Sequence, residues 1–238
     1  MPTFELDYLN PDSDFVESIW RSESEEAGSF TSVATTRSEM VFTRHQGVTT
    51  LHLRGPETKA TLADAPANAE FFGITFKLGV FIPDLPPIAL VDQHPRLTLA
   101  TKQSFWLGDQ QVALPQFSQA NDFIQHLERQ KLIGYEPLVD MILLGQLEKT
   151  RINPRTLQRR FQYATGLSHR TVKQIERARI ALGLLESGVP IFDVIHELEF
   201  TDQPHLTKTL KELIGLTPAR IASMELIHSQ LSKQELKR

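Results

Sequence analysis

The sequence predicts an α+β protein in which a small β-rich N-terminal domain, residues 1–114, precedes an all-α C-terminal domain, residues 115–238. Three observations predict this class. In the first part, short runs of β-branched and aromatic residues are separated by Gly and Pro, which is typical of strands. After Pro115 the apolar residues recur with the helical period instead. Within the second part, a short sequence pattern recurs at an offset of 49 residues, which indicates two similar helical units.

Composition and charge limit the class of protein. Hydrophobic residues make up 40% and charged residues 23% of the chain, as in soluble globular proteins. The chain has no cysteine, which excludes disulfides, cysteine-ligated zinc and a thiol nucleophile. Its acidic N-terminus does not resemble a secretory signal, and its apolar runs fall far short of the ~18–20 residues of a membrane span. We therefore expect a cytoplasmic protein with no membrane partner.

The charge is distributed unevenly along the chain. Residues 151–238 carry 14 Lys and Arg against 9 Asp and Glu, whereas residues 1–150 carry 11 against 20. The whole chain has a net charge of −4, which by itself argues against nucleic acid as a partner. The asymmetry instead indicates a modestly basic binding module joined to an acidic domain.

The N-terminal strands are predicted from apolar alternation and turn residues. Val41–His45 and Val48–Arg54 flank Gln46-Gly47, and this spacing predicts a tight hairpin. Residues 1–40 are polar and acidic, and we expect a loop or frayed segment at Ser22–Glu26. Further along we expect three more strands and one proline-rich loop: Phe71–Lys77, the loop Pro83–Pro87, Leu97–Leu99 and Phe105–Leu107. Several short strands separated by turns predict a small barrel or sandwich.

The repeat carries the functional argument. Leu157–Ser168 and Leu206–Thr217 share Leu, Phe or Leu, Gly, Leu, and Ser or Thr at corresponding positions. Asn153 and Asp202 are good N-caps ahead of the two copies, and a proline lies in the first turn after each cap. Each copy therefore predicts a short helix with one buried face, and each glycine suits the left-handed residue after a helix end.

A long helix is predicted between the copies, at His169–Ser187, with Ser168 as its cap and Gly188 after its end. Its apolar stripe consists of Val172, Ile175, Ala178, Leu182 and Leu185. A helix of ~19 residues spans roughly 28 Å, close to the ~34 Å between successive major-groove faces of B-DNA. The two repeat helices can thus enter adjacent turns on one side of a duplex.

The outer faces of the repeat helices carry side chains suited to DNA. Arg and Lys pair with guanine edges, Gln pairs with adenine, and Thr serves either role. Arg160 is expected to contact a phosphate or to form a salt bridge. The predicted DNA-binding residues are Arg155, Thr156, Gln158, Arg159, Arg160, Gln203, His205, Thr207, Lys208 and Lys211.

A resemblance to a known family is carried by five segments: Arg155–Phe161, Thr165–Ser168, Ile175–Arg179, Asp202–Leu206 and Gly215–Pro218. With them, Arg151–Met224 resembles the DNA-binding domain of the AraC/XylS family of transcription regulators. The resemblance implies seven helices and two helix-turn-helix units, and helices near Ser118–Leu132 and Pro137–Leu144 resemble the family's first two. It also implies that bases are read by Arg155, Gln158 and Arg159 in the first unit and by Gln203, Thr207 and Lys208 in the second.

Three features depart from the family pattern. Glu199 stands where the family usually has Gly in the turn of the second unit, and a non-Gly residue disfavours a left-handed conformation by roughly 1 kcal/mol or more. We therefore expect that turn to be adjusted. Leu210 replaces the usual Phe, and the spacer before Asn153 is longer than a minimal turn.

The resemblance implies a transcription regulator that binds double-stranded DNA. We expect the N-terminal domain to sense a small-molecule effector or to form a homodimer, and an activator would also contact RNA polymerase. Aromatic residues of this domain either line an effector pocket or form the core: Phe71, Phe72, Phe76, Phe81 and Trp106.

Two other classes of function are open. Phe71–Pro87 resembles the cupin-like N-terminal domains of some family members, so one alternative is a cupin-like metal enzyme with an appended helical interaction domain. His45 and His52 are its candidate ligands, but no close His-x-His pair followed by an acid is present. We therefore expect no metal, no cofactor and no catalytic residue. The other alternative is an interaction module that does not touch DNA.

Overall fold

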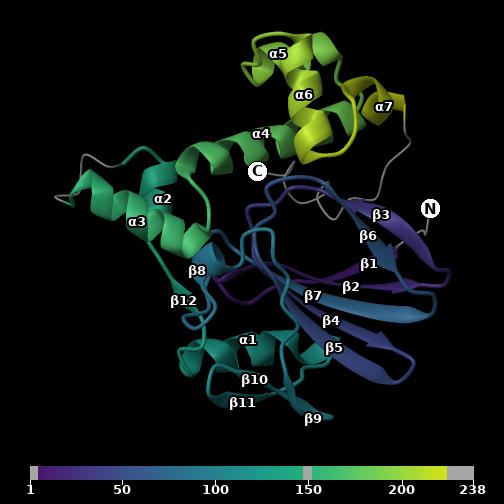
Figure 1. Cartoon of the computed structure of the whole chain (residues 1–238), viewed down its shortest axis with the longest axis vertical. Helices are drawn as coiled ribbons and strands as arrows, with labels where there is room; N and C mark the ends of the chain where they lie inside the picture. Colours follow the sequence, from purple (N-terminus) through teal and green to yellow (C-terminus); the bar gives the residue numbers. More distant parts are fainter. Residues whose placement is uncertain (1–4, 147–151, 224–238) are drawn as a thin grey trace.

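The computed structural model describes residues 5–146 and 152–223, and it confirms the α+β class (Figure 1). Its central element is a five-stranded antiparallel sheet with the strand order β1-β2-β7-β4-β5. The strands are β1 (Glu5–Leu9), β2 (Val16–Ser24), β7 (Ala69–Phe76), β4 (Glu39–His45) and β5 (Val48–Arg54). Among the described strands, β1 and β5 do not pair with each other, so this sheet is open. The strands of residues 5–146 therefore do not form the closed, cupin-like barrel that the sequence suggested.

Smaller sheets surround the central one. A three-stranded sheet has the order β11-β10-β9, and two strand pairs join β3 to β6 and β8 to β12. These strands are β3 (Gly28–Ser32), β6 (Thr61–Ala65), β8 (Val80–Phe81), β9 (Leu99–Thr101), β10 (Ser104–Leu107), β11 (Gln110–Ala113) and β12 (Gly134–Tyr135). The proline-rich segment expected to be a loop turns between β8 and the short 3-10 helix η1 (Pro87–Ala89).

The predicted hairpin is confirmed, and the predicted loop at Ser22–Glu26 is largely wrong. Between β4 and β5, Gln46 and Gly47 both have positive φ, 51° and 74°, as a two-residue type I′ turn requires. Strand β2, however, continues to Ser24, and both Ser22 and Ser24 are buried. The Ser24 hydroxyl donates to the Pro66 carbonyl over 2.5 Å, which satisfies a polar group that the sequence pattern assigned to solvent.

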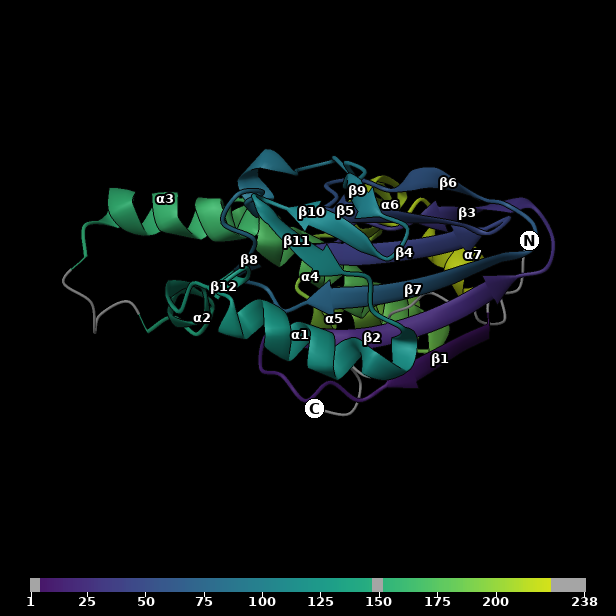
Figure 2. The same cartoon turned by 90° about the horizontal axis from the view of Figure 1, so that it is seen from below.

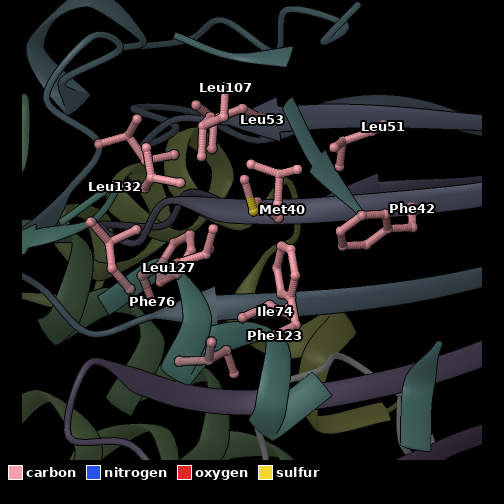
Figure 3. Close-up of a cluster of buried hydrophobic side chains, with 14 of the residues drawn as sticks. Met40, Phe42, Leu51, Leu53, Ile74, Phe76, Leu107, Phe123, Leu127 and Leu132 are labelled. Carbon is pink, nitrogen blue, oxygen red and sulfur yellow. The ribbon is translucent and has the colours of Figure 1, made fainter. Parts of the chain in front are cut away.

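The core of the N-terminal domain lies on one face of the central sheet. Side chains from β4, β5 and β7 meet side chains from α1 (Ala120–Arg129) and β10 there (Figure 3). Phe42 stacks on Phe72 with ring centroids 4.9 Å apart, and Phe123 of α1 meets Phe42 edge-on. Helix α1, preceded by the 3-10 helix η2 (Phe117–Gln119), covers this face of the sheet (Figure 2).

Helix α1 therefore packs with the sheet, although the resemblance placed it among the helices of the C-terminal domain. Its buried residues belong to the N-terminal core, as do Leu132 and Ile133. The core changes between Tyr135 and Leu138, some twenty residues after the boundary at 114/115 that the sequence suggested. Periodicity marks where helices begin, but it does not show which core a helix joins.

The second core is helical. It is formed by α2 (Leu138–Leu143), α3 (Pro154–Thr165), α4 (His169–Glu186), α5 (Ile191–Glu197), α6 (Gln203–Leu213) and α7 (Pro218–Ser223). The predicted apolar stripe of α4 is buried at all five positions. Helices α4–α7 lie on the other side of the sheet from α1 (Figure 1). None of the described helices combines the length and apolar character needed to cross a bilayer.

Candidate nucleic-acid interface

Helices α5 and α6 form a compact helix-turn-helix unit. The chain passes from Glu197 to Gln203 through a five-residue connection, and the Phe200 amide donates to the Ile195 carbonyl over 2.9 Å. Asp202 caps α6, since its carboxylate accepts from the His205 amide at 2.7 Å. Leu206 and Leu210 are fully buried, so the opposite side of α6 faces outward.

The turn of this unit keeps the left-handed conformation despite its non-glycine residue. Glu199 has φ 55°, the region that Gly usually occupies. The expectation that the turn would be adjusted is therefore wrong. The surrounding contacts offset the local cost, because Phe200 is buried in the helical core and Leu198 packs against it.

The first unit is less compact. Asn153 caps α3 by accepting from the Arg155 amide at 2.8 Å, as predicted, and Leu157 and Phe161 are buried. The preceding helix, α2, ends at Leu143, and ten residues separate it from α3. Residues 147–151 within this connection lie outside the described part of the chain. Helix α2 packs against α3, and so does the 3-10 helix η1 of the N-terminal domain.

The two capped helices present their N-terminal halves to solvent. On α3, Arg155, Gln158 and Arg159 are exposed and Thr156 is half-buried. On α6, Gln203, Lys208 and Lys211 are exposed and Thr207 is half-buried, and these residues line an open, concave part of the surface. Figure 1 shows the two helices toward opposite ends of α4. The arrangement gives two separated polar and basic faces joined by a rigid helix.

Residues 147–224, about a third of the chain, match a family described as a helix-turn-helix domain. The C-terminal domain is of the AraC/XylS type. Domains of this type bind DNA and regulate transcription. No match to the chain was found among curated proteins or among solved structures.

Two of the predicted contact residues of the AraC-type domain have partners within the protein. Arg160 forms a two-pronged ion pair with Glu136, with both nitrogen–oxygen distances at 2.8 Å. This agrees with the salt-bridge role, one of the two roles that the sequence left open for it. The ring nitrogen Nδ1 of His205 accepts from the Thr201 amide over 3.4 Å, and the ring packs edge-on against Phe200. His205 therefore helps to order the turn.

The connecting helix of the AraC-type domain contacts both the second unit and the N-terminal domain. The guanidinium of Arg177 lies 4.4 Å from the ring centre of Phe200, which ties α4 to the second turn through a cation–π contact. Burial by itself would raise the pKa of Glu176, but the charges of Arg37 and Arg179 and the hydrogen bonds from Thr36 and Arg37 lower it below its usual value. Glu176 is thus held ionised at the domain contact.

Sequence reasoning missed the N-terminal partners of the AraC-type domain. Thr36 and Arg37 hydrogen-bond to Glu176, and Ala34 is fully buried among the helical side chains. The motif Ala34–Arg37 carries no signal in the sequence that points to a partner more than a hundred residues away. A contact between distant segments of this kind depends on the tertiary fold alone.

The candidate residues of the N-terminal domain do not converge on a site. Burial, then the charges of His94, Arg96 and Arg54, lower the pKa of His52, so its neighbours are basic and unsuited to a shared cation. Among residues 5–146 and 152–223, no three His, Asp or Glu side chains are grouped as a metal site requires. The five aromatic residues also separate: Phe72 and Phe76 are core, Phe71 is half-buried, Phe81 contacts Tyr163 and Trp106 is 43% exposed.

Proposed function

We propose that the protein is a sequence-specific regulator that reads DNA with both α3 and α6. The observation that carries this proposal is the pair of capped helices, equivalent in the repeat, whose N-terminal halves expose Arg, Lys and Gln side chains. Four of these cationic side chains form no ion pair with any described residue: Arg155 and Arg159 of α3, and Lys208 and Lys211 of α6. Their charges are available to phosphates and guanine edges.

The roles of the individual residues follow from their positions. Arg155, Gln158 and Arg159 read bases in the first half-site, and Gln203, Thr207 and Lys208 read bases in the second. Thr156 and Lys211 contact the backbone of the DNA. Arg160 and His205 act by fixing the helices, since both already have partners within the protein.

We further propose that the N-terminal domain conveys a regulatory input, from a small ligand or from a partner protein, to the DNA-binding helices. One cavity of this domain, lined by Leu53, Phe76, Ile82 and Leu90, holds about 10 Å³, which is at the lower limit for a single water and too small for a ligand. Among the described strands β1 pairs only with β2, so its outer edge offers backbone groups to a second copy of the chain. A regulator that activates would also contact RNA polymerase.

The test is selection of bound duplexes from random DNA by the full-length protein. Two enriched half-motifs about one helical turn, ~10 bp, apart are expected if both units read sequence. Affinity for the selected site should fall steeply with salt, because each neutralised phosphate releases counterions. Failure to enrich any motif would contradict the proposal, and a single half-motif would restrict base reading to one unit.

A further inference from the structure

Two glycines at equivalent positions of the repeat both touch the N-terminal domain. Gly166 follows α3, and a Cβ atom placed on it would lie 2.7 Å from the Pro87 carbonyl oxygen and 2.9 Å from Pro56 Cγ. Gly215 follows α6, and a Cβ there would lie 3.0 Å from Thr31 Cγ2 and 3.3 Å from Ala60 Cβ. The C-terminal ends of both candidate recognition helices therefore rest directly on the β-rich domain.

The contact at α6 includes the helix backbone. The last carbonyls of a helix have no partner within it. Here the Ala34 amide donates to the Leu213 carbonyl over 2.7 Å, and the Ala60 amide donates to the Glu212 carbonyl over 2.9 Å. The Ala34 side chain is also completely buried in the helical core. The N-terminal domain thus completes the end of the second recognition helix.

The contact at α3 is made by side chains. Phe81 of β8 meets Tyr163 edge-on with ring centroids 5.5 Å apart, and the Tyr163 hydroxyl reaches the Pro83 carbonyl at 3.4 Å. Between the two ends, Glu176 of α4 is paired with Arg37, which also holds Glu17 of β2 at 2.5 Å. The domain is therefore attached to both units and to the helix that joins them.

These attachments leave the reading faces free. All of the attachments involve the C-terminal ends of α3 and α6 or the middle of α4. The exposed polar residues lie in the N-terminal halves of the two helices: Arg155 and Arg159 in α3, and Gln203 and Lys208 in α6. The docked arrangement therefore leaves the exposed face of each helix accessible to DNA.

We propose that the N-terminal domain is a brace that fixes the distance and orientation of α3 relative to α6, and so selects DNA by the spacing of its two half-sites. Gly166, Gly215, Ala34 and Glu176 are its positioning residues. The inference rests on the proposed DNA-binding function. Holding both helices in place beforehand removes the cost of ordering them on binding, and it penalises sites whose half-motifs are displaced. Each inserted base pair moves a half-site by ~3.4 Å and turns it by roughly 35°.

The test compares glycine variants of the full-length protein on duplexes that carry the selected site, with the half-motifs at natural spacing or with one to three base pairs inserted. Gly166→Ala and Gly215→Val are the brace variants. Gly188→Ala and Gly188→Val are matched controls. Gly188 follows α4 with φ 84°, close to the φ of 72° at Gly166 and 82° at Gly215, and no described residue lies within 4 Å of a Cβ placed on it. The controls carry the backbone strain without the clash.

Wild type and controls are expected to lose ~10-fold or more in affinity when the spacing changes, about the cost of one mismatched base pair. The brace variants should bind the natural spacing ~10-fold more weakly and respond at most about threefold to the insertions. A melting curve of each variant establishes that it is folded. The double variant Arg37→Gln/Glu176→Gln, which adds no bulk, should also flatten the spacing response.

Two outcomes would overturn the inference, and they differ from failure of the proposed function. One is a spacing profile of folded Gly166→Ala and Gly215→Val that matches the Gly188 controls. The other is an unchanged profile in the folded double variant. If wild type itself selects no DNA, the proposed function fails instead, and that result is obtained before any variant is made.

Discussion

The carboxylate of Glu176, midway along α4, accepts hydrogen bonds from both Thr36 and Arg37 of the N-terminal domain. The ion pair with Arg37 is largely screened from water, with side-chain exposures of 16% for Arg37 and 27% for Glu176. Such a pair contributes little compared with an apolar contact, but the loss of one member is costly because the remaining, largely buried charge loses part of its compensation. The domain contact is therefore sensitive to this position.

Replacing Glu176 with Gln should destabilise the full-length protein. The amide retains part of the hydrogen bonding but not the charge, and Arg37 keeps Glu17 as a partner. We expect the free energy of unfolding to fall by about 1–3 kcal/mol. Urea denaturation followed by circular dichroism measures this difference.

Glu70→Gln is the matched control, because the Arg44–Glu70 pair joins neighbouring strands and both side chains are about 60% exposed. It should change the free energy of unfolding by about 0–1 kcal/mol. Equal effects of the two substitutions would show that the Glu176 pair contributes no more than an exposed one.

Replacing Arg159 with Ala should weaken binding to the selected DNA site by ~1–3 kcal/mol and relax the preference at one base pair. The reason is that Arg159 is exposed on the outward face of α3, where a guanidinium can reach a guanine edge. Fluorescence anisotropy with the selected duplex and its single-base variants measures both effects.

Arg129→Ala removes the same charge from α1, which packs on the far side of the sheet. It should leave affinity and base preference within about twofold of wild type, since a charge outside the two reading helices is largely screened at physiological salt. If Arg159→Ala also leaves the base preference unchanged, Arg159 is not a base reader.

Replacing Glu199 with Gly should stabilise the second turn. Glu199 has φ 55°, which costs a non-glycine residue about 1–2 kcal/mol, and the greater freedom of Gly in the unfolded chain returns part of that gain. We expect a net increase of about 0.5–1 kcal/mol in the free energy of unfolding, measured by urea denaturation. Glu199→Ala keeps the strain while removing the carboxylate, so an equal gain in that variant would assign the effect to charge.

Local sequence patterns predicted the parts of this structure that depend on neighbouring residues. The hairpin at Gln46-Gly47, the caps Asn153 and Asp202, and the buried stripe of α4 all follow from short-range rules, and all are present. For the same reason, the exposed faces of α3 and α6 were predictable in advance.

The failures share a different cause. Ser22 and Ser24 lie within β2 because both pair with β7 and the Ser24 hydroxyl finds the Pro66 carbonyl, and no nearby residue indicates this. Whether the sheet closes depends on the pairing of β1 and β5, which are far apart in sequence. The contact of Ala34 with Leu213 joins two unremarkable residues whose positions only the tertiary structure determines.

The last prediction concerns Glu186, near the C-terminal end of α4. Both carboxylate oxygens are buried without a hydrogen-bond partner in the described part of the chain, and burial raises the pKa of Glu186 from 4.5 to about 7. A carboxyl group whose pKa is raised in the folded state stabilises that state only while the group is protonated. Its contribution is therefore fully present below pH 4.5 and is lost as pH rises through 7.

Glu186→Gln should abolish that loss. Because the residue is only half-buried, solvent screening reduces the effect, and we expect the variant to gain about 1 kcal/mol over wild type between pH 4.5 and pH 8. Unfolding free energies of both proteins across this range give the difference at each pH. The control is Glu197→Gln on α5, where the side chain is exposed. The difference in unfolding free energy between Glu186→Gln and wild type could vary with pH no more than the difference for the control. That outcome would mean that Glu186 ionises freely in the folded protein.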